Sequence, residues 1–319
     1  WKEILYGFPL GSILGPLFFN IIICDMFYLL EDFGVANYAD DSTPYCSGVD
    51  YEGVSENLEK SSAILFKWLN DNYMKINTDK SHLVMSGNAK VTVNIDGNFI
   101  ESENQQELLG ILIDSNLTFD DHITNICKKV SQKLNALTRV STYMDIPKRR
   151  LLMKSFISSQ FGYCPLIWMF HSRGLNNKIN LLHKRALKIT YGDKDLTYQE
   201  LLEMDNSVSV HHRNLQILAT EMFKVYKEIS PEILNEVFER NSSACNLRNK
   251  SFFRSRSVNS VYHGTESLSF LGPKIWDLVP FDIKKSENVD IFKDRIKKWI
   301  CDECPCRLCK TFVKDLGFI

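Results

Sequence analysis

The stretch VANYADDSTPYC, residues 35–46, decides the fold expected for the first part of the chain. Two β-prone runs flank an adjacent acidic pair, Asp40 and Asp41, which predicts a β-hairpin with both carboxylates at its tip. Pro44 lies in the second run and has no backbone N–H, so we expect that strand at the edge of its sheet. Two like charges this close favour a bound divalent cation, and hard oxygen ligands favour Mg²⁺ or Mn²⁺.

Helical and extended patterns surround this hairpin. Five apolar residues that follow it recur at helical spacing and predict an amphipathic helix: Leu58, Leu65, Trp68, Leu69 and Tyr73. Strands are expected over 82–85, 91–95 and 108–113, because turn residues separate these runs. The longest apolar stretch, residues 13–30, contains Gly, Pro, Asn and Asp, which favours a buried helix over a membrane span. Residues 1–118 are therefore expected to be α/β, with a hairpin-rich sheet.

Charge is unevenly distributed, although the 319 residues carry a formal net charge of only -1. Residues 1–118 hold 6 Lys and Arg against 17 Asp and Glu, and residues 119–194 hold 14 against 4. Residues 195–319 hold 18 of each. The basic segment is typical of a domain that follows a phosphate backbone, although a solvated helical face gives the same pattern.

Residues 119–194 are expected to be mostly helical. An apolar stripe from Ile123 to Leu137 predicts one long helix, and two more are expected over 147–161 and 175–191. Several basic residues on these helices are candidates for contacts with nucleic-acid phosphates: Lys128, Lys129, Lys133, Arg149, Arg150, Lys184, Arg185 and Lys188.

Further motifs occur in a fixed order along the chain: GFPLGSILGPLFFN at 7–20, YADD at 38–41, WLNDNYMKINTDKS at 68–81, LGI at 109–111, LHKRA at 182–186 and GPKIW at 272–276. Together they resemble the reverse transcriptase of non-LTR retrotransposons of the LINE type, jockey- or RTE-like. The resemblance implies the C-terminal portion of such an enzyme. It would comprise a partial polymerase palm over 1–118, a basic helical thumb over 119–194, and a mixed C-terminal region with a cysteine-rich tail over 195–319.

The resemblance also implies roles for individual residues. Asp40 and Asp41 would ligate Mg²⁺ or Mn²⁺, and Lys80 would protonate the leaving pyrophosphate unless it is simply a surface lysine at the start of a strand. Six residues would lie against the nucleotide or the primer: Pro9, Gly11, Ser12, Tyr38, Leu109 and Gly110. The family's reaction extends a DNA primer with deoxynucleotides on an RNA template. The resemblance also implies a nuclear or cytoplasmic location and no membrane partner.

One departure concerns the third metal-binding carboxylate. In the family it comes from a strand before the motif that begins here at Gly7. Asp25 lies near the end of the following helix and is expected to cap it or face solvent. We therefore expect residues 1–319 alone to be inactive as a polymerase. The alternative is a non-catalytic nucleic-acid-binding remnant or a domesticated module.

Four of the nine cysteines form the array C-x2-C-x-C-x2-C near the end of the chain: Cys301, Cys304, Cys306 and Cys309. This spacing resembles that of zinc ligands, although the loop is tight for one tetrahedral ion. Some of these sulfurs would instead join a distant histidine such as His263 or His171, or would remain free thiols. The histidines show no H-E-x-x-H spacing, so nothing supports a zinc hydrolase.

Overall fold

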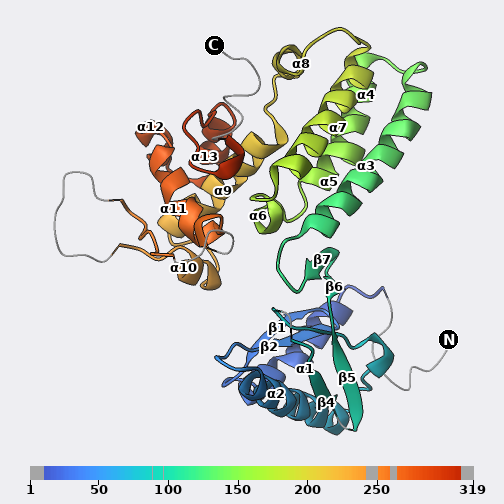
Figure 1. Cartoon of the computed structure of the whole chain (residues 1–319), viewed down its shortest axis with the longest axis vertical. Helices are drawn as coiled ribbons and strands as arrows, with labels where there is room; N and C mark the ends of the chain where they lie inside the picture. The colour runs from blue at the N-terminus through green and yellow to red at the C-terminus, as the bar shows by residue number, and fades with distance from the viewer. Residues whose placement is uncertain (1–10, 88, 96, 242–250, 259–263, 310–319) are drawn as a thin grey trace. The chain divides into compact units, whose positions relative to one another are not determined.

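The computed structural model describes residues 11–87, 89–95, 97–241, 251–258 and 264–309. Figure 1 shows short strands in the first part of the chain and helices through the rest. The chain divides into two compact units, Trp1–Leu117 and Thr118–Ile319, which we call the N-terminal unit and the C-terminal unit. This arrangement confirms the predicted α/β class, with hairpin-like sheets followed by a helical region.

The first helix of the N-terminal unit, α1 (Gly15–Leu29), begins after Ser12, whose Oγ accepts a hydrogen bond from the Gly15 N–H at 3.0 Å. The helix is apolar on most sides, yet only its Ile23 and Met26 side chains are buried. Ile21 is 60% exposed and Tyr28 is 79% exposed. The expectation of a buried helix is therefore met on one face only.

Helix α2 (Tyr51–Asp71) packs against α1 through Leu65 and Trp68, as the apolar spacing predicts. The prediction that Tyr73 belongs to the same apolar face is wrong. Tyr73 follows the end of the helix with a positive φ of 57° and is 97% exposed. A positive φ turns the chain out of the helix, so helical spacing no longer describes the direction of its side chain.

Three small sheets complete the N-terminal unit. The hairpin consists of β1 (Gly34–Tyr38) and β2 (Asp41–Tyr45), which pair antiparallel. The other strands are β3 (Leu83–Val84), β4 (Thr92–Ile95), β5 (Asn98–Glu103), β6 (Gln105–Leu108) and β7 (Ile111–Asp114). In the three-stranded sheet β5 lies between β3, to which it is parallel, and β4, to which it is antiparallel.

Two strand predictions need correction. The segment 108–113, expected as one strand, is interrupted by the turn that joins β6 to β7. Strand β5 was not predicted, because its sequence NFIESE alternates only weakly between apolar and polar residues. Both errors concern short strands, of four to six residues.

The C-terminal unit begins with a helical layer around the long helix α3 (Asp120–Ser141), whose predicted apolar stripe is buried. The other elements of this layer are α4 (Ile146–Leu152), a π-helical turn (Met153–Ser158), α5 (Ser159–Phe161), α6 (Pro165–Trp168), α7 (Arg173–Tyr191) and α8 (Tyr198–Asp205). Helix α7 packs along α3 and ends at Tyr191, as expected from the sequence. Gly192 closes it with a φ of 76° and an N–H bond to the Lys188 carbonyl.

A second core follows within the same unit. Its elements are α9 (Val210–Tyr226), α10 (Ile233–Val237), α11 (Leu268–Leu278), α12 (Phe281–Lys284) and α13 (Val289–Ile296). Phe223 of α9 stacks on Phe292 of α13 with ring centroids 4.2 Å apart, and Trp276 of α11 lies beside them. Helix α9 also contacts α7, and both helices belong to the same compact unit; the expected boundary at residue 194 stays a prediction. None of the helices in the described ranges is both long and apolar enough to cross a bilayer.

Candidate active site, nucleic-acid interface and cysteine cluster

The acidic pair lies at the tip of the β1–β2 hairpin, as the sequence predicts. Tyr38 pairs with Asp41 across the ladder, and a two-residue turn at 39–40 joins the strands. The Asn37 side chain braces this tip, because its Nδ2 donates to the Ala39 carbonyl at 2.9 Å and its Oδ1 accepts from Ser42 Oγ at 2.5 Å. Asn37 and Ser42 therefore fix the turn that presents the carboxylates.

Both carboxylates are exposed, as is Tyr38, and no basic side chain in the described part of the chain forms an ion pair with them. Asp25 is exposed on α1, which agrees with the expectation that it faces solvent. Among the described residues, no third Asp, Glu, His or Cys joins Asp40 and Asp41 in a metal-sized group. The hairpin thus offers two adjacent hard-oxygen ligands that attract a cation but do not enclose it.

Pro44 pairs with Val35 in the hairpin. Strand β2 has β1 as its only partner among the described strands, so Pro44 lies on an edge strand as expected.

Of the residues expected near the nucleotide, Gly11 and Ser12 lie just before α1. Pro9 is outside the described residues. Gly11 has a φ of 81°, and a Cβ built there would meet no atom within 4 Å, so its backbone faces open space. Ser12 Oγ is used to cap α1. Position 11 therefore favours glycine because of its positive φ, and not because a larger side chain would clash with neighbouring atoms.

Leu109 and Gly110 form the two-residue turn between β6 and β7, with φ values of 50° and 82°. Two successive positive φ angles indicate a type I′ turn, which favours Asn-Gly. Leucine is an unusual choice at the first position, and its side chain is 42% exposed. Backbone strain of this kind, beside an exposed apolar side chain, is a recognised feature of functional sites.

Lys80 ends a short 3₁₀ turn (Thr78–Lys80) just before β3, and its side chain is exposed. No described contact joins it to Asp40 or Asp41, so both of its predicted roles stay open.

The basic residues of the C-terminal unit differ in their surroundings. Lys128 and Lys129 are exposed on α3, while Lys133, Arg149, Lys184 and Lys188 are half-buried. Arg149 Nε donates to the Met144 carbonyl at 2.9 Å, and Lys188 Nζ donates to the Lys194 carbonyl. Arg149 and Lys188 are thus each anchored by one hydrogen bond to a backbone carbonyl. None of these six residues forms an ion pair with an acidic residue in the described part of the chain.

Arg150 has a different environment. Its Nε donates to Asp205 Oδ1 at 2.6 Å, and its Nη2 donates to the Asp205 carbonyl. Asp205 is buried and also accepts from the Tyr191 hydroxyl at 2.7 Å. Burial raises the pKa of this carboxyl, but hydrogen bonds from Tyr191, Arg150 and Ser207 outweigh it and hold the pKa below its usual range. Arg150 therefore forms a structural ion pair with Asp205 and is not one of the proposed phosphate contacts.

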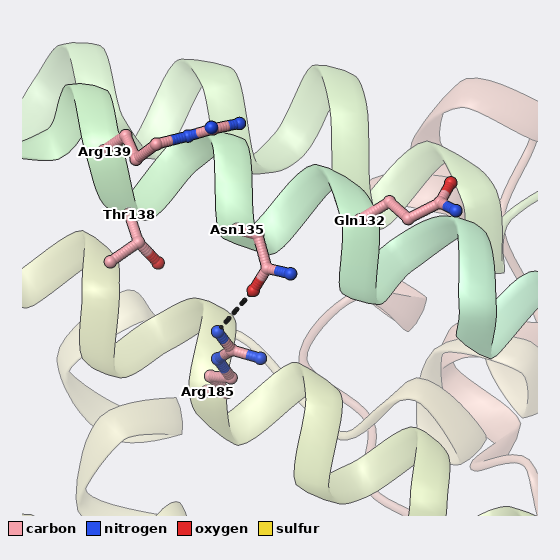
Figure 2. A pocket seen from close by; sticks show the side chains of 5 residues that line it. All are labelled: Gln132, Asn135, Thr138, Arg139 and Arg185. Atoms are coloured by element: carbon pink, nitrogen blue, oxygen red, sulfur yellow. Dashed lines mark hydrogen bonds between the residues drawn. The ribbon is translucent and has the colours of Figure 1, made fainter.

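A surface pocket lies between α3 and α7 (Figure 2). Its lining residues are Gln132, Asn135, Thr138, Arg139 and Arg185. Arg185 Nη2 donates to Asn135 Oδ1 at 2.8 Å, so the two helices meet here. The lining offers guanidinium, amide and hydroxyl groups and no carboxylate, which suits an anionic ligand such as a phosphate.

The pocket residues on α3 were missed at the sequence level, although a signal exists. Lys128, Gln132, Asn135 and Arg139 recur at four, three and four residues, and so form a polar stripe on the helix face away from the buried apolar stripe. A search for basic residues finds Lys128 and Arg139 at the two ends of this stripe, but it does not find Gln132 and Asn135 between them.

The tail cysteines gather against the start of α9. The ligand atoms of His211, Cys304, Cys306 and Cys309 all lie within 4.8 Å of one another. Hydrogen bonding with Cys301, Cys306 and Cys309 lowers the pKa of the Cys304 thiol, and hydrogen bonding with Cys304 raises the pKa of Cys301.

Cys301 is buried nearby but is not part of this group of four. Of the two histidines considered from the sequence, His263 lies outside the described residues. His171 is buried and hydrogen-bonds to the Trp168 carbonyl instead. His211 is not predicted as a ligand, because it lies far before the cysteines in the sequence and so shows no ligand spacing with them.

Comparison with known proteins agrees with this picture. Residues 2–113 match the family described as reverse transcriptase (RNA-dependent DNA polymerase). The chain is 25% identical over 204 residues to the RNA-directed DNA polymerase from mobile element jockey of Drosophila melanogaster, a match that covers 59% of this chain and 22% of that protein. It is also 25% identical over 201 residues to the probable RNA-directed DNA polymerase from transposon BS of the same species, covering 57% and 22%.

These matches span about a fifth of the length of those relatives, 22% in each case. No solved structure matches the chain. The matched segment includes the acidic hairpin and ends in β7, just after the Leu109–Gly110 turn. Residues 2–113 are therefore similar to the reverse transcriptase family, and the longer matches relate the chain to RNA-directed DNA polymerases of Drosophila mobile elements.

Proposed function

We propose that this chain is the C-terminal part of an RNA-directed DNA polymerase. In the full-length protein the β1–β2 hairpin would present Asp40 and Asp41 to the metal and nucleotide, and the C-terminal unit would hold the template–primer duplex. The observation that carries this proposal is the exposed acidic pair at a hairpin tip braced by Asn37 and Ser42. The reaction would extend a DNA 3′-hydroxyl with deoxynucleotides on an RNA template.

The donor set at the hairpin fits Mg²⁺ or Mn²⁺. Both ions bind carboxylate oxygens, and Mg²⁺ is commonly held by one or two carboxylates together with substrate phosphates. When bound, the ion would neutralise negative charge on the nucleotide phosphates. Asp40 and Asp41 would hold it, while Tyr38 would flank the primer end. With two carboxylates alone the site is open, so we propose that the 319-residue polypeptide by itself does not polymerise.

Terbium luminescence tests the cation site directly. Tb³⁺ takes the same oxygen ligands, and excitation of a nearby tyrosine sensitises its emission; Tyr38 pairs directly with Asp41. We expect the emission to fall at least fivefold in Asp40→Asn/Asp41→Asn. The matched control is Glu31→Gln/Asp32→Asn, which removes another adjacent, exposed acidic pair of the same unit. Equal emission from wild type and the hairpin variant would refute the cation site.

The C-terminal unit supplies the proposed duplex contacts. Arg139 and Arg185 line the α3–α7 pocket, and Lys128 and Lys129 are exposed on α3. None of these four residues forms an ion pair with a described acidic residue. Lysines and arginines on helices contact phosphates more readily than base edges, so binding should show little sequence preference. If about five phosphates are neutralised, the logarithm of the binding constant should fall against log salt with a slope of about −4 to −5.

Fluorescence anisotropy with an RNA–DNA duplex measures this slope. Arg139→Gln/Arg185→Gln should make the slope shallower by about 2, because each lost phosphate contact removes about 0.9. Lys60→Gln/Lys67→Gln removes two exposed lysines of α2 and is the matched control. A slope that the pocket variant leaves unchanged would contradict a role for this pocket in duplex binding.

The alternative is a non-catalytic nucleic-acid-binding remnant or domesticated module. It shares the binding prediction but requires no cation at the hairpin, so the terbium experiment separates the two. Primer extension on an RNA template with Mg²⁺ or Mn²⁺ adds a second test. Template-dependent incorporation by residues 1–319 that disappears in Asp40→Ala would overturn the proposed inactivity. For the full-length enzyme, which must reach chromosomal DNA, we propose a nuclear and cytoplasmic location.

A further inference from the structure

The described end of the chain folds back onto the first turn of α9. Gln216 of α9 holds it there, because its Nε2 donates to the Lys297 carbonyl at 3.2 Å and to the Trp299 carbonyl at 2.9 Å. The cysteine segment then passes His211, which lies one residue into α9. Cys306 Sγ lies 3.3 Å from His211 Nε2 and 3.3 Å from Cys304 Sγ.

We propose that His211, Cys304, Cys306 and Cys309 bind one Zn²⁺ ion as a structural site. The site is separate from the proposed polymerase function, and it replaces the all-cysteine set that the sequence spacing suggests. Three ligands come from the tail and one from α9, so the ion would join the end of the chain to the core of the C-terminal unit.

The spacing of the four ligand atoms fits a tetrahedral ion. Zinc–sulfur bonds of about 2.3 Å and zinc–nitrogen bonds of about 2.0–2.1 Å place tetrahedral ligand atoms about 3.5–3.8 Å apart. Here two of the pairs are 3.3 Å apart, and every pair lies within 4.8 Å. Shifts of at most about 1 Å between ligand atoms would complete the coordination.

Burial favours a closed site over a catalytic one. Cys306 is fully buried, Cys304 is 4% exposed and His211 is 7% exposed. Four protein ligands leave no position for water or substrate, which is the pattern of structural zinc. The surroundings are apolar, since Cys301, Cys304 and Cys306 belong to the same core as Trp276 and Phe292.

A disulfide does not explain the cluster equally well. One disulfide would use two of the three sulfurs and leave the third thiol beside a buried imidazole. His211 Nδ1 is buried without a hydrogen-bond partner among the described atoms, whereas its Nε2 faces the sulfurs. A zinc ion would use all three sulfurs and this nitrogen together.

Cys301 gives the proposal a sharp internal control. It is buried and hydrogen-bonds to Cys304, but its sulfur does not belong to the group of four. His212 is the matching control for His211, because it is the next residue of α9 and its Nδ1 bonds to Ser209 Oγ at 2.9 Å. An all-cysteine site requires Cys301 and not His211. The site proposed here requires His211 and not Cys301.

The test uses the whole 319-residue chain, produced with zinc and kept reduced. Elemental analysis should find one zinc per chain in wild type, Cys301→Ser and His212→Gln, and at least tenfold less in Cys306→Ser. His211→Gln should bind zinc at least tenfold more weakly in competition with a chromogenic chelator. Loss of zinc in Cys301→Ser with retention in His211→Gln would overturn the proposed ligand set, and a zinc-free wild type would overturn the site itself.

Cobalt substitution of the wild type keeps the test valid if a cysteine variant does not fold. Co²⁺ bound by three thiolates and one imidazole in a tetrahedron gives intense visible absorption, whereas octahedral Co²⁺ does not. The tetrahedral spectrum should appear at one equivalent and disappear on addition of one equivalent of Zn²⁺. A purely octahedral spectrum would refute the site. None of these readouts depends on Asp40 or Asp41, so failure here leaves the terbium experiment unaffected.

Discussion

Replacement of Arg150 by methionine should destabilise the C-terminal unit rather than weaken nucleic-acid binding. Removing one partner of a buried ion pair costs about 3–5 kcal/mol. The Asp205 side chain is 2% exposed but that of Arg150 is 39% exposed, so water reaches the guanidinium and softens the loss. The Tyr191 hydroxyl continues to donate to Asp205 in the variant. We therefore expect a loss of about 2–3 kcal/mol.

Thermal unfolding followed by circular dichroism measures this loss. For a unit of about 200 residues, 1 kcal/mol corresponds to about 2–4 °C, so the midpoint should fall by about 4–12 °C. Arg149→Met is the matched control, because the neighbouring arginine makes only a bond to the neutral Met144 carbonyl. That control should cost about 0.5–1.5 kcal/mol. A double-mutant cycle with Asp205→Asn should give a coupling energy of at least about 1 kcal/mol.

The acid dependence of the same variant supplies a second check. The folded pKa of Asp205 lies below its unfolded value of about 3.9, so its stabilising contribution is present above that value and is lost as the pH falls through the lower folded pKa. The difference between wild type and Arg150→Met should stay constant from pH 8 to about pH 5 and shrink below about pH 4. An unchanged midpoint together with weakened duplex binding would refute the reasoning and return Arg150 to the phosphate contacts.

Three further perturbations test individual features of the fold. Leu109→Asn should stabilise the N-terminal unit by about 0.5–1 kcal/mol in urea unfolding, because Asn tolerates the positive φ that strains leucine; destabilisation would mean that the leucine side chain packs more than its exposure suggests. Burial lowers the pKa of His183, which bonds to the Tyr198 hydroxyl, to about 4. His183 should therefore contribute a loss of about 2 kcal/mol to the C-terminal unit between pH 7.5 and 5, as the unfolded state takes up the proton, and His183→Asn should remove that part of the dependence in urea titrations at both pH values. Gly192→Ala should lower the melting temperature of the same unit, since alanine at φ 76° costs about 1 kcal/mol; an unchanged value would show that the end of α7 adjusts freely.

Long periodic segments of the fold were predictable from the sequence. The apolar stripe of α3 runs from Ile123 to Leu137 and repeats over about four turns, so an error at any single position does not change the assignment. Strand β5 and the break between β6 and β7 were not predictable in this way, because strands of four to six residues offer too few positions for a period to be recognised.

The candidate sites differ in the same way, because local sites can be predicted from the sequence and sites built from distant residues cannot. The acidic hairpin is a local feature, so residues 35–46 contain both the strands and the ligands. The His211–Cys306 contact and the Arg185–Asn135 contact join residues that are far apart in the sequence. Such contacts depend on helix packing, which single-sequence periodicity does not specify.

The division of the chain into two units after Leu117 affects how strongly each one needs to bind. The backbone crosses between the units once, so a duplex bound to one unit is tethered to the other. Two linked contacts of this kind can give an effective concentration in the millimolar range for the second contact. Under the function proposed above, the acidic hairpin of the full-length enzyme would therefore need only a millimolar affinity of its own for the primer end. The C-terminal unit would supply the remaining affinity for the duplex.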